Sequence, residues 1–323
     1  AEACALNTPG LMYCRAQICI YYLLWTATVI PKITLEQETT TAKNWDCPAE
    51  CICLSAKQVL CNTGGLKDIP THQLPQTVEE LSLTKNNFPI IKGDAFAGLR
   101  VLRKLTMDGN NISTIRPFAT VEPDAFDGLQ HVGLLKLTFM DLSSLQSFTF
   151  RGLSYVHSLN IQESDLGIIE KEAFSGLTHV DRLNILNNKV DLIERLFLRT
   201  DNAIELLRFH GNHVLEAPRH AKDIILEVGS ISAVDNHFPC DCQAHNILES
   251  DFVNGTVSEF QKRNYCISPI EYNGKPMNLV DFDVIARCHD NVVQDNLGSG
   301  VVGVFSLPTT IFLVLLLSMN LCQ

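Results

Sequence analysis

The pattern VEELSLTKNNF, at residues 78–88, returns six times along this chain. The later copies read LRKLTMDGNNI, VGLLKLTFMDL, VHSLNIQESDL, VDRLNILNNKV, IELLRFHGNHV and, more weakly, VGSISAVDNHF. Their fourth residues, at intervals of 24, 30, 24, 24, 24 and 24, are Leu81, Leu105, Leu135, Leu159, Leu183, Leu207 and Ile231. A period of this length indicates a repeat protein in which each copy forms one coil of a solenoid.

Each copy has the pattern of a short strand with one buried edge. Apolar residues stand at the first, fourth, sixth and eleventh places, and Asn usually stands at the ninth. Because side chains alternate along a strand, Leu81 and Leu83 are expected to point inward, whereas Ser82 and Thr84 point outward. One coil cannot bury its apolar edge alone, so neighbouring coils stack and share a core. This leucine-rich repeat pattern predicts an α/β fold, a right-handed solenoid (horseshoe) with a parallel β-sheet on its concave face.

Two further positions recur at the same period. The motifs AFAGL, AFDGL, FTFRGL and AFSGL place four rings at one expected depth, those of Phe96, Phe126, Phe150 and Phe174. Asn recurs after the strand at Asn86, Asn110, Asn188, Asn212 and Asn236. Its side chain is expected to lie inside the turn and to satisfy backbone groups there. Met140 and Ser164 interrupt this ladder, so looser turns are expected in the third and fourth copies.

The interval of 30 reflects six extra residues around RPFATV, residues 116–121. In a solenoid, an insertion of this kind forms a loop on one side. Such a loop is either a contact element for a partner or, more commonly, neutral, and the sequence leaves both readings open.

Composition restricts the compartment and the partners. The chain has 323 residues, 46% of them hydrophobic, and a formal net charge of -11, which is unsuited to binding nucleic acid. Its 12 cysteines would be unusual in a reducing cytosol. Four lie near the ends of the chain, at Cys4, Cys14, Cys19 and Cys322. The other eight form two sets of four that flank the repeats.

These two sets are expected to form caps, because a solenoid exposes its core at both ends. The stretch CPAECICLSAKQVLC resembles the N-terminal cysteine cap of extracellular leucine-rich repeat proteins, and CDC with two later cysteines resembles their C-terminal cap. Spacing alone leaves three connectivities within each set. The resemblance implies the pairs Cys47–Cys53, Cys51–Cys61, Cys240–Cys266 and Cys242–Cys288. The CxC spacing differs from that of most structural zinc sites, so we expect no zinc.

The resemblance covers residues 47–288 and implies a binding module, as in Slit-like, connectin-like or Nogo-receptor-like cell-surface proteins. It divides this region into an N-terminal cap at 47–77, repeats at 78–239 and a C-terminal cap at 240–288. The chain departs from the family after CDC, where QAHNIL replaces the usual Trp. Leu248 is expected to fill that space.

The first 46 residues are read as an extension, a signal and a linker. Met12 and Arg15 precede the apolar run ICIYYLLWTATVI, which has the length of a secretory signal. We therefore assign residues 1–30 to an N-terminal extension and signal peptide that starts at Met12, and residues 31–46 to a linker.

The C-terminal segment predicts a glycosylphosphatidylinositol (GPI) anchor. Small residues, a spacer and an apolar tail follow one another in NLGSGVVGVFSLPTTIFLVLLLSMNLCQ. Residues 289–300 are read as a stalk with Gly298 as the lipid attachment site, ahead of Asn296 and Ser299, and residues 301–323 as the removed signal. The alternative is a spanning helix without a cytoplasmic tail. The expected location is the extracellular face of the plasma membrane.

The outward strand positions predict a mixed surface suited to a protein partner. The candidate partner-binding residues are Leu134, Lys136, Phe139, Arg182, Leu186, Leu206 and Arg208. Exposed apolar clusters often mark interaction sites, although glycans, loops or local packing can also shield them. Two sequons, at Asn111 and Asn254, fit a secreted glycoprotein.

Three histidines could bind a metal or act in catalysis: His210, His213 and His237. Ordinary surface histidines are commoner than functional ones, and the sequence shows no hydroxyl and carboxylate pairing beside these three that would suggest nucleophilic catalysis. We expect no enzyme activity, no metal and no cofactor. The sequence predicts an adhesion molecule or ligand-binding co-receptor that meets an extracellular protein ligand or a cell-surface co-receptor. The alternative is a shed or matrix-associated regulator that sequesters a secreted factor or inhibits an enzyme.

Overall fold

The computed structural model describes residues 47–86, 88–110, 120–142 and 144–288. The signal peptide, the linker, most of the 116–121 loop, the Asn111 sequon, Gly298 and the tail lie outside the described residues. Those predictions therefore stay predictions. No helix among the described residues is long and apolar enough to cross a membrane.

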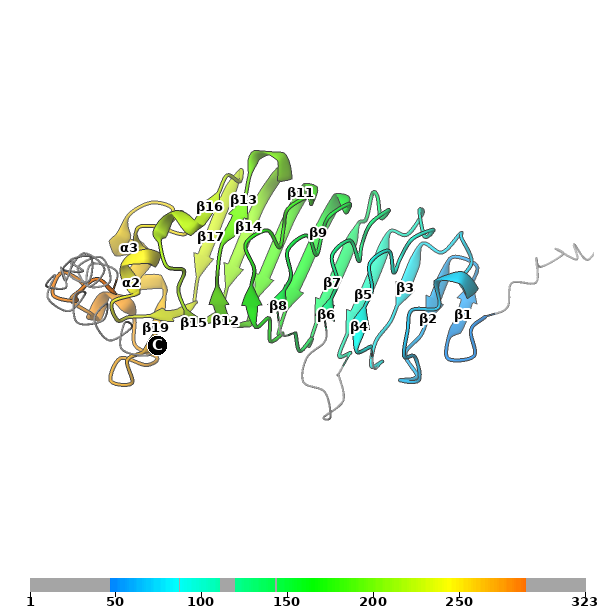
Figure 1. The fold of residues 1–323 in the computed structure, drawn as a ribbon, viewed down its shortest axis with the longest axis horizontal. Coiled ribbons are helices and arrows are strands. Elements are labelled where there is room, and N and C mark those ends of the chain that lie inside the picture. The colour runs from blue at the N-terminus through cyan, green and yellow to red at the C-terminus, as the bar shows by residue number, and fades with distance from the viewer. Residues whose placement is uncertain (1–46, 87, 111–119, 143, 289–323) are drawn as a thin grey trace, which may run out of the picture. The chain divides into compact units, whose positions relative to one another are not determined.

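The N-terminal cap and the repeats together form a nine-stranded sheet in the order β1-β2-β3-β5-β7-β9-β11-β14-β17 (Figure 1). Its strands are β1 Ile52–Ser55, β2 Gln58–Leu60, β3 Glu80–Ser82, β5 Lys104–Asp108, β7 Leu134–Thr138, β9 Ser154–Gln162, β11 Thr178–Leu186, β14 Ile204–His210 and β17 Ser230–Val234. Only β1 and β2 pair antiparallel; every later pair is parallel. A parallel pair needs a crossover between its strands, and one repeat supplies it.

Strand register confirms the alignment of the repeats. Leu81 pairs with Leu105, Leu105 with Leu135, and the series continues in step through Leu159, Leu183, Leu207 and Ile231. All of the leucines in this column are buried. A slip of one residue would turn the apolar set outward, so burial fixes this register.

The return side of each coil consists of short strands and turns. A six-stranded sheet contains β8 Ser144–Leu145, β10 Ile168–Ile169, β12 Lys189–Ile193, β15 His213–Glu216, β18 His237–Pro239 and β19 Tyr265–Ser268. Two smaller pairs join β4 Ile90–Ile91 to β6 Thr120–Val121 and β13 Leu196–Leu198 to β16 Ile224–Leu226. The helical elements among the described residues are α2 Ala244–Leu248 and α3 Val257–Arg263, with 3-10 turns at Thr71–Gln73, Thr200–Asn202, Ala221–Asp223 and Met277–Leu279. The chain is thus an α/β leucine-rich repeat solenoid with few helices.

Four phenylalanine rings stack inside the coils, as the recurring motifs predict. The centroids of Phe96 and Phe126 lie 5.5 Å apart, those of Phe126 and Phe150 lie 5.6 Å apart, and those of Phe150 and Phe174 lie 5.3 Å apart. All four side chains are buried. Rings at these separations attract one another beyond the effect of burial alone. Successive coils are therefore joined at the phenylalanine level as well as at the strands.

The asparagine ladder continues through Ser164, so the prediction of an interruption there was wrong. The Ser164 hydroxyl accepts from the Met140 backbone N–H at 3.0 Å, and the Ser164 N–H donates to Asn188 Oδ1 at 3.0 Å. A hydroxyl oxygen replaces the amide oxygen here. Met140 is the real interruption, because its side chain has no oxygen to accept from a backbone N–H of the preceding coil. In that coil the buried Nδ2 of Asn110 has no hydrogen-bond partner.

Four disulfides close the two caps, joining Cys47 to Cys53, Cys51 to Cys61, Cys240 to Cys266 and Cys242 to Cys288. They are the pairs that the family resemblance implies. At the N-terminal end the β1–β2 hairpin pairs with β3. At the other end Asn264 accepts from the Asn236 N–H at 3.0 Å, which carries the ladder into the cap. Leu248 is buried in α2.

Two histidines stack on the return side. His213 and His237 pair in register between β15 and β18, with ring centroids 4.3 Å apart, and Tyr265 stacks on His237 at 5.3 Å. Burial and then the proximity of His213 lower the pKa of His237 from its ordinary value of 6.5. The folded protein therefore favours the neutral imidazole.

A Phe150→Ala variant tests the ring stack. Removing this buried ring deletes contacts with two neighbouring coils, and we expect a loss of about 3–5 kcal/mol in the free energy of unfolding. Urea unfolding of the purified protein measures it. Phe139→Ala is the matched control, because Phe139 is 55% exposed. The control should stay within about 0.5 kcal/mol of the parent. Equal losses in the two variants would contradict a stabilising role for the stack.

A second prediction concerns pH. Because the folded-state pKa of His237 is lowered, the unfolded chain binds the proton more readily, and stability should fall as pH drops below the ordinary value of 6.5. We expect His237→Gln to reduce the loss of melting temperature between about pH 7.5 and about pH 5.5. Thermal unfolding at both pH values measures this difference. An unchanged pH dependence in the variant would exclude His237 as a contributor.

Candidate protein-binding face

The outward side chains of the nine-stranded sheet form two straight columns. The first contains Glu80, Lys104, Leu134, Ser158, Arg182 and Leu206. The second contains Ser82, Thr106, Lys136, Asn160, Asn184 and Arg208. We call these two columns the strand face. Both follow the strand register that the repeat alignment predicts.

The middle of the strand face is cross-linked by polar side chains. Asn184 Nδ2 donates to Asn160 Oδ1 at 2.7 Å, and Ser158 Oγ donates to the same oxygen at 2.9 Å. Asn184 is buried beneath its neighbours. This network ties β9 to β11 through side chains as well as through the backbone. A partner would meet a preorganised surface, which lowers the ordering cost of binding.

The predicted apolar positions do not join into one patch. Leu134, Leu186 and Leu206 are half-buried on three different strands. Register places Leu186 beside His210, four residues along the strand from Leu206. Phe139 lies beyond the end of β7, in a left-handed conformation with φ of 50°. It is exposed, but at the turn and not on a strand.

The cations of the strand face differ in how they are paired. Lys136 Nζ lies 3.7 Å from Asp108 Oδ2. The Arg182 guanidinium contacts Nε2 of His157. Arg208 is exposed and makes no ion pair within the described part of the chain. Register places Arg182 beside Leu206 and Arg208 beside Asn184. The structure therefore brings Arg182, Leu206 and Arg208 together on β11 and β14.

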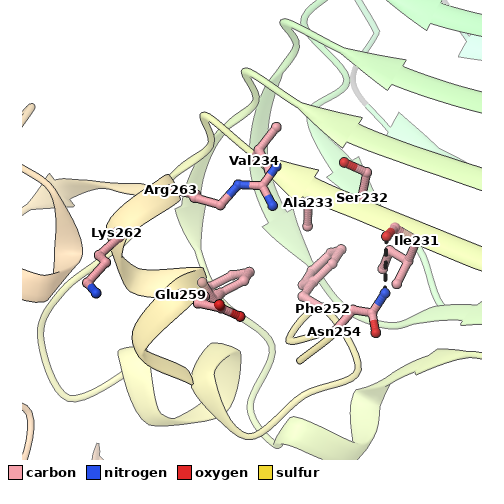
Figure 2. A pocket seen from close by; sticks show the side chains of 10 residues that line it. Ile231, Ser232, Ala233, Val234, Phe252, Asn254, Glu259, Lys262 and Arg263 are labelled. Atoms are coloured by element: carbon pink, nitrogen blue, oxygen red, sulfur yellow. Dashed lines mark hydrogen bonds between the residues drawn. The ribbon is translucent and has the colours of Figure 1, made fainter. Parts of the chain in front are cut away.

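A cavity of about 500 Å³ lies where β17 meets the C-terminal cap (Figure 2). Ile231 lines it from β17, and Glu259 and Arg263 line it from α3. Asn254, the sequon residue, also lines it and donates from Nδ2 to the Ile231 carbonyl at 3.3 Å. The sequon threonine, Thr256, caps α3 by accepting from the Glu259 N–H. The sequence predicts the sequon but not the cavity beside it.

A serine and a histidine meet at the same end of the sheet. Ser232 Oγ lies 2.8 Å from Nε2 of His210, which is the hydrogen-bond distance found between a serine nucleophile and its histidine base. A hydrolytic triad also requires a third group that orients the imidazole. No described side chain binds the other ring nitrogen of His210. Burial lowers the pKa of His210, which is the largest influence on it. The arrangement lacks one part of a triad.

The histidines do not converge as metal ligands. His213 and His237 contact each other through their ring faces, with Tyr265 next in the stack. Within residues 47–86, 88–110, 120–142 and 144–288, no group of three or more His, Cys, Asp or Glu residues is placed to hold a metal ion.

Sequence reasoning missed one surface feature altogether. His131 lies just before β7, Tyr155 and His179 lie at the starts of β9 and β11, and the three rings stack. Tyr155 and His179 line a cavity of about 600 Å³. Their interval of 24 residues is readable in the sequence. The signal was present, but it lies outside the eleven-residue pattern on which the repeats were aligned.

No family model and no curated protein matches this chain. The similar solved structures include human 5T4 (Wnt-activated inhibitory factor 1, trophoblast glycoprotein), with 18% identity over 75% of this chain and 99% of that chain and a TM-score of 0.39. Another is TLR13 in a complex with ssRNA13, with 18% identity over 67% of this chain and 35% of that chain and a TM-score of 0.41. This chain thus spans about a third of the TLR13 chain.

The assignment of the fold depends on the geometry of the chain itself. Parallel strands repeat in register, one core runs through the coils, and disulfides close both ends. The chain is a leucine-rich repeat solenoid with cysteine caps, the architecture of the extracellular proteins that its sequence resembles.

Proposed function

We propose that this chain is an extracellular protein-binding module, acting in cell adhesion or as a ligand-binding co-receptor, and held on the outer leaflet by a GPI anchor. The observation that carries the proposal is the strand face: two columns of mixed side chains on a sheet whose register is fixed by burial. Such a face offers many contacts at defined positions and little that resembles a catalytic centre.

The centre of the proposed contact is the group of Arg182, Leu206 and Arg208. Arginine is enriched among the residues that dominate the binding energy of protein interfaces. The half-buried Leu206 beside the two arginines adds apolar contact area. Arg208 has no described ion partner, so a carboxylate of a binding partner would meet a cation that is free to pair. This chemistry suits a protein ligand with acidic and apolar side chains on one surface.

The anchor and the glycans belong to the same proposal. Small residues around Gly298 followed by an apolar tail support lipid attachment, and disulfide-closed caps support an oxidising compartment. We place glycans at Asn254 and Asn111. A glycan at Asn254 would stand beside the cavity at the C-terminal cap, and therefore off the centre of the strand face.

The alternative is a shed or matrix-associated regulator that sequesters a secreted factor or inhibits an enzyme. It would use the same strand face, so the two functions differ in where the protein is found. Accumulation of the protein mainly in the medium, with little on the cell surface, would favour this alternative.

An Arg208→Glu variant tests the strand face. Cells that display the full chain would first be screened against surface and secreted proteins for a ligand. For the ligand found, we expect Arg208→Glu to weaken binding at least about tenfold, because it places a like charge against the proposed acidic surface. Titration of labelled ligand onto displaying cells measures this.

Arg219→Glu is the control for that experiment. Arg219 is also exposed, but it follows β15 on the return side, so the variant makes the same charge change away from the strand face. We expect it to bind like the parent. Equal weakening by both variants would show that the loss of binding comes from the change in net charge and not from the strand face. Unchanged binding by Arg208→Glu would contradict the proposed contact.

The anchor is tested separately. A phospholipase specific for phosphatidylinositol should release the protein from intact expressing cells into the medium, because it cleaves the lipid of a GPI anchor. Immunoblots of the cell and medium fractions measure the release, with heat-inactivated enzyme as the control. Protein that stays on the cells after treatment would contradict the anchor and favour a spanning segment.

A further inference from the structure

Three aromatic side chains form a stacked row along one edge of the strands. The ring centroids of His131 and Tyr155 lie 4.9 Å apart at an interplanar angle of 6°, and those of Tyr155 and His179 lie 4.5 Å apart at 19°. All three side chains are exposed. Their backbones share a left-handed conformation, with φ of 58°, 54° and 56°. The solenoid repeats this geometry with each coil, so the rings overlap face to face.

The row ends at Ala203. This residue holds the next equivalent position, directly before β14, and its φ of 46° places it in the same left-handed region. A methyl group stands there in place of a ring. Within the described residues, His179 stacks on Tyr155 and on no second ring. A cavity of about 600 Å³ opens here, and His179 and Ala203 line it.

A second column beside the row supplies charge. Its members are His157, Asp181, Glu205 and Gly229, and all four line the cavity. Asp181 Oδ2 lies 2.6 Å from Nδ1 of His157. Nε2 of the same ring contacts the Arg182 guanidinium. The His157 ring thus lies between Asp181 and Arg182 and contacts both.

Glu205 is the free charge of the cavity. It is exposed, and its carboxylate makes no hydrogen bond or ion pair with any described residue. The next position of the column is Gly229, where a Cβ would stand 2.8 Å from the Glu205 carbonyl oxygen. The close approach of the two backbones excludes a larger residue, and the cavity stays open on that side. Its wall therefore has two carboxylates, and no Lys or Arg lines it.

We propose that this cavity binds the guanidinium group of an arginine side chain presented by a protein partner. The guanidinium stacks on the free face of His179, where the row lacks its next ring, and pairs with Glu205 and Asp181. Only a planar cation satisfies both requirements: it stacks on rings and meets carboxylates with a fork of N–H donors, whereas a lysine ammonium has no plane to stack. The inference depends on the proposed protein-binding function and adds the chemistry of one contact.

The test uses the full chain and a short peptide as the probe. Saturation-transfer NMR would be recorded with acetyl-Gly-Arg-Gly-amide in excess over the protein, since a single side chain binds weakly. The same peptide with citrulline in place of arginine keeps the length and planarity but has no charge. We expect transfer to the arginine side-chain protons, and a signal at least about fivefold weaker for citrulline. Equal signals for the two peptides would overturn the proposal.

Two variants locate the site. Ala203→Tyr extends the row with the protein's own ring, in a conformation that Tyr155 already adopts, and should abolish the arginine signal. Glu205→Gln keeps the shape of the side chain, removes the free charge and should reduce the signal severalfold. Glu216→Gln is the control, an exposed glutamate of β15 on the return side, and should leave the signal unchanged. If Ala203→Tyr fails to fold, Glu205→Gln still decides the matter. An arginine signal that both variants preserve would overturn the assignment.

Two further outcomes are separable from these. A neutral oligosaccharide that gives a signal abolished by Ala203→Tyr, without any arginine signal, would assign the cavity to a sugar and overturn the proposal. A ligand whose binding is weakened by Arg208→Glu but not by Ala203→Tyr or Glu205→Gln would preserve the strand-face function and overturn the arginine contact. Weaker ligand binding by both Ala203→Tyr and Glu205→Gln would support the arginine contact.

Discussion

The structure depends on the inability of any single coil to bury its own apolar edge. Leu105, Leu135 and Leu159 are sealed only because the coils on both sides supply the missing neighbours, and the Phe126 and Phe150 rings repeat the same dependence at a second level. Stability in such a chain is a series of nearest-neighbour terms, so the end coils are weakest. The four disulfides of the described residues lie at the ends of the solenoid, where an apolar face has no further coil to cover it.

The same dependence governs the backbone. After each strand the chain turns with N–H groups that the sheet does not use, and a side-chain oxygen from the next coil accepts from them. The ladder therefore needs an oxygen at a fixed position more than it needs asparagine. Ser164 satisfies the requirement with a hydroxyl, whereas the Met140 side chain has no oxygen, and the buried Nδ2 of Asn110 in the preceding coil has no hydrogen-bond partner. Asn264 extends the ladder into the C-terminal cap, so core and cap share one hydrogen-bond series.

Sequence reasoning reached the features that burial makes periodic and missed those that depend on individual contacts. The leucine column, the phenylalanine stack and both columns of the strand face follow from the period alone. The role of Ser164 did not, because a letter pattern treats serine as a break although its oxygen performs the same task. Phe139 was placed on a strand because the pattern does not show where β7 ends. Leu134, Leu186 and Leu206 lie on the strands that the alignment gives them, but the pattern does not show how far each side chain is buried.

Core and surface are under different constraints in this solenoid, and that difference locates its binding chemistry. Inward positions must repeat, since each ring or leucine has to fit the coil before it. Outward positions have the same spacing, but their side chains do not have to fit the coil before them. A row of similar side chains can therefore start, change or stop at any coil. The row of aromatic rings stops at Ala203, and the column beside it ends at Gly229, where the approach of two backbones permits no side chain. Packing therefore fixes the end of the column at Gly229, whereas the row of rings ends at Ala203 because a methyl group stands there, and the unpaired Glu205 lies beside that gap. A binding site of this kind is expected wherever an outward row is interrupted while the core beneath it continues.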